Sequence, residues 1–190
     1  MKELLQIIIL TIITSCGSNQ SIVEFTADEK FELCSELKYN SLVKEYGPPD
    51  KLIYSENIHS LFENFLLQEK ILTEISTKGY SELIAKVKRK EIKPEFFAEF
   101  NKELGFNPYL LFRINSHISC YDYPFLRLEL FDKTSWRYDF LDAYWRFEAN
   151  GDLNSDNNYL IDAINKIPDN KFKMITYRKL FLDLIYTQLN

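Results

Sequence analysis

The residue types that most often act as catalytic bases or metal ligands are scarce in this chain. His59 and His117 are its only histidines, and they lie far apart in the sequence. The sequence contains no glycine-rich phosphate loop, no nucleophile elbow and no His-Glu-x-x-His pair. We therefore expect both histidines to be surface or hydrogen-bonded residues, and we expect that the protein is not an enzyme.

Oxygen-bearing side chains recur at alternate positions in the segment 152–158, a spacing that suits a hard cation. Asp152, Asn154 and Asp156 match the first three ligand positions of a calcium loop. Asn157 stands where such a loop needs glycine, and Ala163 stands where it needs a bidentate acid. A polar connection between two helices fits the same residues. We expect no metal or other cofactor, and the three residues stay only as a calcium candidate.

An apolar run, Leu4–Ile13, stands near the start of the chain. It is too short to span a bilayer, because a spanning helix needs about 20 apolar residues. The run leads into Ile13-Thr14-Ser15-Cys16, which resembles the lipobox of bacterial lipoproteins. The resemblance implies that residues 1–15 are a cleaved signal peptide and that Cys16 carries fatty acids such as palmitate. Secretion without acylation is the alternative.

The residues after Cys16 bear on where a lipid anchor would lie. Gly17 follows it, in place of the aspartate that resembles an inner-membrane retention signal, and no acidic run comes next. The resemblance therefore implies a lipid-anchored protein of the bacterial cell envelope, held in the outer membrane and facing the periplasm. Two or more acyl chains hold a protein stably on a membrane. Residues 16–25 would be the acylated cysteine and a tether, and residues 26–190 a single domain.

Cys34 and Cys120 are the two remaining cysteines. An even pair in an oxidising compartment suits a disulfide. A closed loop of that length would stabilise the fold by about 4.5 kcal/mol through loop-closure entropy. Two separate buried thiols are the alternative, because free cysteine packs as a small hydrophobic residue.

Apolar spacing predicts a mainly α-helical domain. Apolar residues recur at steps of three and four over the ranges 58–75, 96–104, 136–147 and 174–185. Glycine follows several helical stretches, where a left-handed residue commonly ends a helix: Gly47, Gly79, Gly105 and Gly151. Leucines alternate with charged residues at positions 126–130, so one short β pair within residues 109–131 is an open alternative.

One helical segment, residues 136–148, carries aromatic residues on two sides. A helix that is apolar all round is normally buried. Trp, Tyr and Arg, however, dominate interface hot spots. If the protein has a partner, this segment is the first candidate for the interface, through Tyr138, Leu141, Trp145, Arg137, Asp142 and Arg146.

Charge restricts the classes of partner. The formal net charge of −5 argues against nucleic acid, whose phosphates need a basic surface. We expect the membrane-anchored protein to bind another protein, in the manner of an immunity protein that neutralises a toxin acting in the periplasm. The run Gly47-Pro48-Pro49-Asp50 also resembles small lipoproteins of outer-membrane assembly. That resemblance implies the alternative, a structural or adaptor role in envelope assembly or transport.

Overall fold

Helices form nearly all of the regular structure in a computed structural model of the chain. The structure describes residues 25–48, 56–112, 119–120, 134–150 and 158–189. These residues contain no strand. They form one mainly α-helical domain, as the sequence predicts. The helices are a long first helix (residues 25–46), α2 (Ile58–Gln68), α3 (Thr77–Lys88), α4 (Glu95–Leu104), the 3-10 turn η2 (Tyr109–Leu111), α6 (Trp136–Asn150), α7 (Tyr159–Lys166), α8 (Asp169–Phe172) and α9 (Ile175–Leu189).

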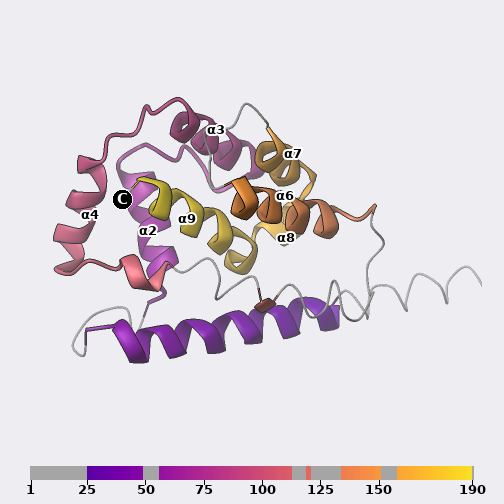
Figure 1. Ribbon diagram of the computed structural model, residues 1–190, viewed down its shortest axis with the longest axis horizontal. Helices are drawn as coiled ribbons and strands as arrows, with labels where there is room; N and C mark the ends of the chain where they lie inside the picture. The colour runs from indigo at the N-terminus through magenta and orange to yellow at the C-terminus, as the bar shows by residue number, and fades with distance from the viewer. Residues whose placement is uncertain (1–24, 49–55, 113–118, 121–133, 151–157, 190) are drawn as a thin grey trace, which may run out of the picture.

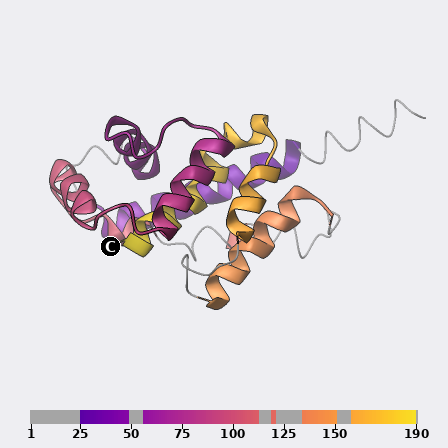
Figure 2. The same cartoon turned by 90° about the horizontal axis from the view of Figure 1, so that it is seen from above.

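The last helix, α9, lies at the centre of the domain (Figure 1). It contacts α2, α3 and α8, while α7 packs against both α3 and α6. From above, α3 and α7 lie side by side (Figure 2). Every residue of α9 from Thr176 to Tyr186 is buried. A helix buried on all sides needs neighbours on all sides. The first helix covers a side of α9 that α2, α3 and α8 leave open.

The first helix runs along one edge of the domain, below the other helices in Figure 1. Its buried residues recur every three or four positions and face the core: Ala27, Asp28, Phe31, Ser35, Tyr39, Leu42 and Val43. The ring of Phe31 lies 5.2 Å from that of Tyr177 on α9. One face of this helix therefore completes the core, and the opposite face points outward.

Aromatic rings fill the core between α2, α4 and α9. Phe62 is fully buried, and its ring contacts the rings of Phe97, Phe100, Phe112 and Tyr186 at centroid distances of 5.1–5.8 Å. Such pairs add about 0.5–1.5 kcal/mol each beyond the burial of apolar area. The closely spaced aromatic residues of the sequence thus form a core that joins helices distant from one another along the chain.

Two of the predicted helix ends are confirmed and one is wrong. Gly105 ends α4 in the left-handed conformation, with φ of 71°, and the first helix ends just before Gly47. Gly79, however, lies inside the first turn of α3, where its N–H donates to Ser76 Oγ. A Cβ at position 79 would stand 2.2 Å from the backbone oxygen of Glu74, which explains the glycine.

Lysines, and not glycines, adopt the left-handed conformation after α2 and α3. Lys70 and Lys90 have φ angles of 60° and 57°. After each, a backbone N–H donates back to the helix, from Ile71 to Leu66 and from Glu91 to Lys86. These bonds are the Schellman pattern. Because α2 ends at Gln68, the single helix expected over residues 58–75 is too long.

The alternative of a β pair within residues 109–131 falls largely outside the described residues. The part that is described, Tyr109–Leu111, is a 3-10 turn. Gly151 and the calcium candidates Asp152, Asn154 and Asp156 also lie outside the described residues, as do His117 and Cys16.

Candidate functional site

Three buried charged residues of α9 are candidates for a reactive site. Arg178, Lys179 and Asp183 are each less than a tenth exposed, although they belong to the central helix of the core. Burying a charge is costly unless it is paired and hydrogen-bonded. Each of the three side chains contacts a different partner. The partner shows whether the charged group has a structural role or could take part in a reaction.

Asp183 pairs with His59 of α2. The Oδ1 atom of Asp183 lies 2.7 Å from Nε2 of the imidazole, and the Oδ1 atom of Asn57 lies 2.9 Å from Nδ1. Both ring nitrogens therefore face oxygen acceptors, and both contacts are satisfied when both nitrogens carry hydrogen. His59 and Asp183 are 0% exposed. Because no substrate can reach them in this conformation, the pair is a hydrogen-bonded core contact.

Arg178 pairs with Glu63, also on α2. Its Nη1 atom donates to the backbone oxygens of Phe172 and Lys173, at 2.7 Å each. The hydroxyl of Tyr80 also donates to the Glu63 carboxylate. Burial, followed by the charge of Glu63, raises the pKa of Tyr80 well above its usual value. The tyrosine therefore stays protonated and acts as a donor that joins α3 to α2.

Lys179 and Ser35 form the arrangement closest to a nucleophile with its base. The ammonium nitrogen lies 3.1 Å from the serine Oγ. Burial lowers the pKa of Lys179, although nearby Asp183 and Glu36 act against the shift. Serine–lysine pairs do serve in acyl transfer. Sequence reasoning could not find this pair, because its members are separated by 144 residues.

Two features argue that this pair is structural. Both side chains are buried, with 1% and 2% exposure for Ser35 and Lys179. Ser35 also lies in the middle of a continuous helix, where the backbone N–H is bound within the helix. A catalytic serine normally stands on a tight turn, next to N–H groups that can bind an oxyanion. The pair instead ties the first helix to α9.

Asp28 makes a second polar attachment near the start of the first helix. Arg137 Nη2 donates to its Oδ1 atom at 3.0 Å, and Lys171 and the Tyr177 hydroxyl also donate to this carboxylate. Burial alone would raise the pKa of Asp28, but these hydrogen bonds outweigh it and the net pKa is lowered. The carboxylate therefore stays charged and links the first helix to α6, α8 and α9.

A covalent bond completes the attachment. Cys34 and Cys120 form a disulfide, the first of the two alternatives that the sequence allows, with their Cα atoms 5.7 Å apart. Further along, the Tyr39 hydroxyl accepts a hydrogen bond of 2.9 Å from the backbone N–H of Ile58. The first helix is thus held to the core at several points along its length, so its outer face is a fixed surface.

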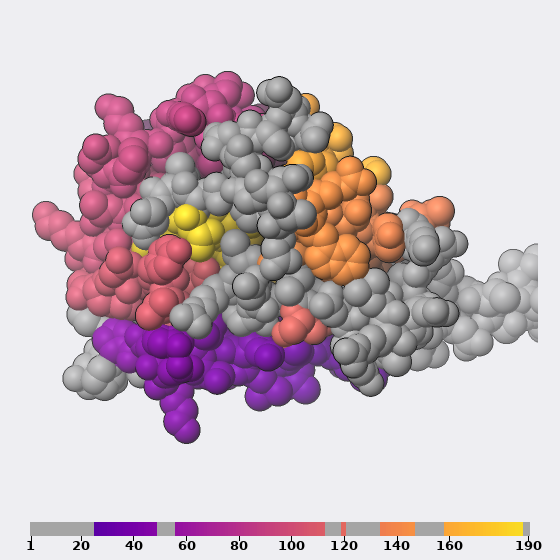
Figure 3. Space-filling view, in the orientation of Figure 1, coloured from indigo at the N-terminus to yellow at the C-terminus, as the bar shows by residue number. Residues whose placement is uncertain are grey.

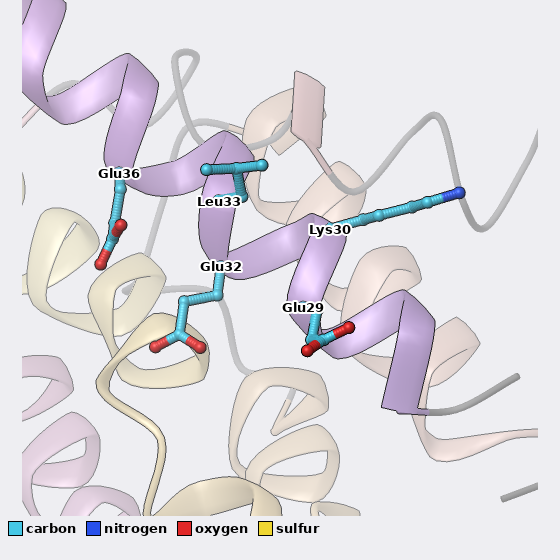
Figure 4. A pocket seen from close by; sticks show the side chains of 5 residues that line it. All are labelled: Glu29, Lys30, Glu32, Leu33 and Glu36. Carbon is cyan, nitrogen blue, oxygen red and sulfur yellow. The ribbon is translucent and has the colours of Figure 1, made fainter. Parts of the chain in front are cut away.

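That outer face combines apolar and acidic side chains. Leu33 and Leu37 are 58% and 62% exposed. Beside Leu33 lies a shallow hollow of about 510 Å³, whose lining residues are shown in Figure 4: Glu29, Lys30, Glu32, Leu33 and Glu36. The first helix forms the lower edge of the surface in Figure 3. An arrangement of this kind can bind a partner surface, and this face is the candidate site.

The interface predicted on the helix of residues 136–148 needs correction. Leu141 and Arg137 are each 1% exposed: the leucine packs in the core and the arginine pairs with Asp28. They cannot contribute to an exposed interface. Of the remaining candidates, Tyr138 and Trp145 are partly buried, and Arg146 pairs with Asp142 at 2.7 Å across one helical turn.

The described residues contain no group of three histidine, cysteine or acidic side chains placed to hold a metal ion. Among the same residues, none of the helices has the length and apolar character that a membrane-spanning segment needs.

Comparison of the chain with protein-family models, with curated proteins and with solved structures found no match.

Proposed function

We propose that this chain is a lipid-anchored protein of a bacterial cell envelope that binds another protein, in the manner of an immunity protein that neutralises a toxin in the periplasm. The observation that carries the binding role is the outer face of the first helix, where exposed leucines lie beside acidic side chains. The proposal assigns binding rather than catalysis because the most reactive groupings in the described residues, Asp183–His59 and Lys179–Ser35, lie inside the core.

The disulfide supports the proposed location. Stable disulfides form in oxidising compartments, which include the bacterial periplasm, and are rare in the cytosol. The lipobox-like run ending at Cys16 supports an anchor, and it precedes the first helix by only a short stretch of chain. From Cys16 to Phe25 an extended chain reaches at most about 30 Å. The binding face would therefore work close to the membrane surface.

Metabolic labelling with palmitate tests the anchor. We expect the wild-type protein to incorporate the label in a bacterial host and Cys16→Ala to lose it. A wild-type protein without label, or a mutant labelled equally, would contradict the proposal.

Crosslinking in intact cells, followed by isolation of the protein from the membrane fraction, tests the binding role. A secreted toxin as the crosslinked partner would support neutralisation. A component of an outer-membrane machine would instead support the structural or adaptor role. Recovery of the protein without any specific partner, from cells that express it at its natural level, would argue against both.

A further inference from the structure

The outer face of the first helix carries two adjacent rows of side chains, one apolar and one acidic. Leu33 and Leu37 are one helical turn apart and form an exposed apolar pair. Glu29, Glu32 and Glu36 recur at steps of three and four beside them, so they form an acidic line along the same helix. In Figure 4 the three carboxylates project to one side, away from Lys30.

Within the described part of the structure, the acidic line has one nearby cation from another helix: Glu32 and Glu36 favour the charged form of the buried Lys179 on α9. Its three carboxylates are exposed, and none of them makes an ion pair or hydrogen bond there. Lys30 is the one cationic residue among those that line the hollow. The surface therefore has a local excess of negative charge around an apolar centre, which opposes contact with anionic lipid and favours a cationic partner.

We propose that this face binds a basic, amphipathic helix of a partner protein. Apolar side chains of that helix would cover Leu33 and Leu37, while its lysines or arginines would approach Glu29, Glu32 and Glu36. Amphipathic helices commonly bind in this way, through anchors spaced one turn apart and a charged rim. This inference rests on the proposed binding function and specifies the chemistry of the partner.

The attachment of the first helix suits it for this role. Cys34 directly follows Leu33 and is fixed by the disulfide to Cys120. Ser35, one residue further on, is hydrogen-bonded to Lys179. A surface that is rigid before binding loses less conformational entropy when the complex forms. The apolar pair thus lies on a segment of the helix that is attached to Cys120 through Cys34 and to α9 through Ser35.

A synthetic peptide tests the proposal directly. The probe is a labelled helix of about 18 residues (five turns), with leucine on one face and lysine on the other. The same peptide with glutamate in place of lysine is the control. Fluorescence anisotropy with the full-length protein in neutral detergent should show binding of the lysine peptide and not of the glutamate peptide. No binding of the lysine peptide would overturn the proposal.

Matched variants locate the binding. We expect Glu29→Gln/Glu32→Gln/Glu36→Gln to weaken the affinity for the lysine peptide about tenfold, because the charged rim is removed. Leu33→Ser/Leu37→Ser should weaken it by a similar factor. The control carries the same number of changes on α4, at the exposed residues Glu95, Glu99 and Glu103, and should stay within about twofold of wild type. Equal losses in both glutamine variants would show unspecific charge attraction and overturn the assignment.

Other occupants of this face give different results. If a second copy of the chain covers it, sedimentation will show a dimer that Leu33→Ser/Leu37→Ser dissociates. If a lipid surface covers it, the protein without its anchor (Cys16→Ala) will bind vesicles of anionic lipid. Either result would overturn the proposal. Failure of palmitate labelling would overturn the proposed anchoring without changing the peptide result, since peptide binding does not need the anchor.

Discussion

Arg178 and Glu63 lie 115 residues apart in the sequence and meet in the core through two parallel hydrogen bonds. The arginine Nε atom donates to Oε1 at 2.7 Å, and Nη2 donates to Oε2 at 2.9 Å. Both side chains are less than a tenth exposed. The pair joins α9 to α2, so it links the central helix to a segment that precedes it by more than half of the chain.

Removing one member of this ion pair should destabilise the fold. We expect Arg178→Met to lower the free energy of unfolding by about 3–5 kcal/mol, because it leaves the Glu63 charge buried without its partner. Urea denaturation would measure the change. Lys166→Met is the control, since Lys166 and Asp139 form a solvent-exposed pair and such pairs contribute little to stability. The double variant Glu63→Leu/Arg178→Met should recover part of the loss; no recovery would contradict this explanation.

The disulfide should stabilise the fold strongly. Reduction of Cys34–Cys120 is expected to lower the free energy of unfolding by about 4.5 kcal/mol, since it frees a long loop in the unfolded chain. The measurement is a urea transition with and without reductant. Cys34→Ser/Cys120→Ser should match the reduced wild type and should not respond to reductant. A wild-type midpoint that reductant leaves unchanged would show that the bond adds no stability.

Asp28 should make stability depend on acidic pH. Its pKa is lower in the folded protein than the ordinary value of 3.8, so the folded state binds the proton less readily than the unfolded state. The stabilisation is complete above about pH 4 and is lost as the pH falls through the lowered pKa.

We expect Asp28→Asn to reduce the slope of unfolding free energy against pH in this acidic range, measured by urea titrations at a series of pH values. The exposed Asp162 provides the control variant Asp162→Asn, which should keep the wild-type slope. Identical slopes in wild type and Asp28→Asn would rule out this role for the carboxylate.

Replacing a lysine that has a positive φ angle with glycine should stabilise the protein. Lys90→Gly is expected to raise the free energy of unfolding by about 0.5–1 kcal/mol. Glycine adopts the positive φ without the penalty of a Cβ, and this gain exceeds its extra entropy in the unfolded chain. Lys38→Gly, in the middle of the first helix, makes the same chemical change at a helical position. It should lower stability by about 0.5–1 kcal/mol, and the same sign for both variants would contradict the assignment.

Helix type and several boundaries could be predicted from the sequence because they depend on local spacing. The apolar period of three and four residues identified the segments of α2, α4, α6 and α9, and Gly105 marked the end of α4. Local rules failed at Gly79, whose reason is the close approach of the Glu74 backbone, and at Lys70 and Lys90. In those lysines the chain reversal imposes a conformation that their side chains do not prefer.

The candidate site could be located only from the tertiary structure. A buried Lys179 and a solvated lysine look alike in a sequence, since burial of a charge depends on partners that the fold brings from far away. The same holds for Arg137 and Leu141, which were predicted at an interface and lie in the core. The leucines at positions 33 and 37 fit the apolar period of any helix, and only the packing of the first helix shows that they face outward.

By itself, therefore, the sequence determined the helical class, the cysteines that are available for pairing and the lipobox-like run at Cys16, because each is written in neighbouring residues. The tertiary structure decided that Cys34 meets Cys120, that the reactive groups of α9 are enclosed, and that the first helix presents Leu33 and Leu37 beside its carboxylates. These features join segments up to 144 residues apart, and local spacing carries no information about such contacts.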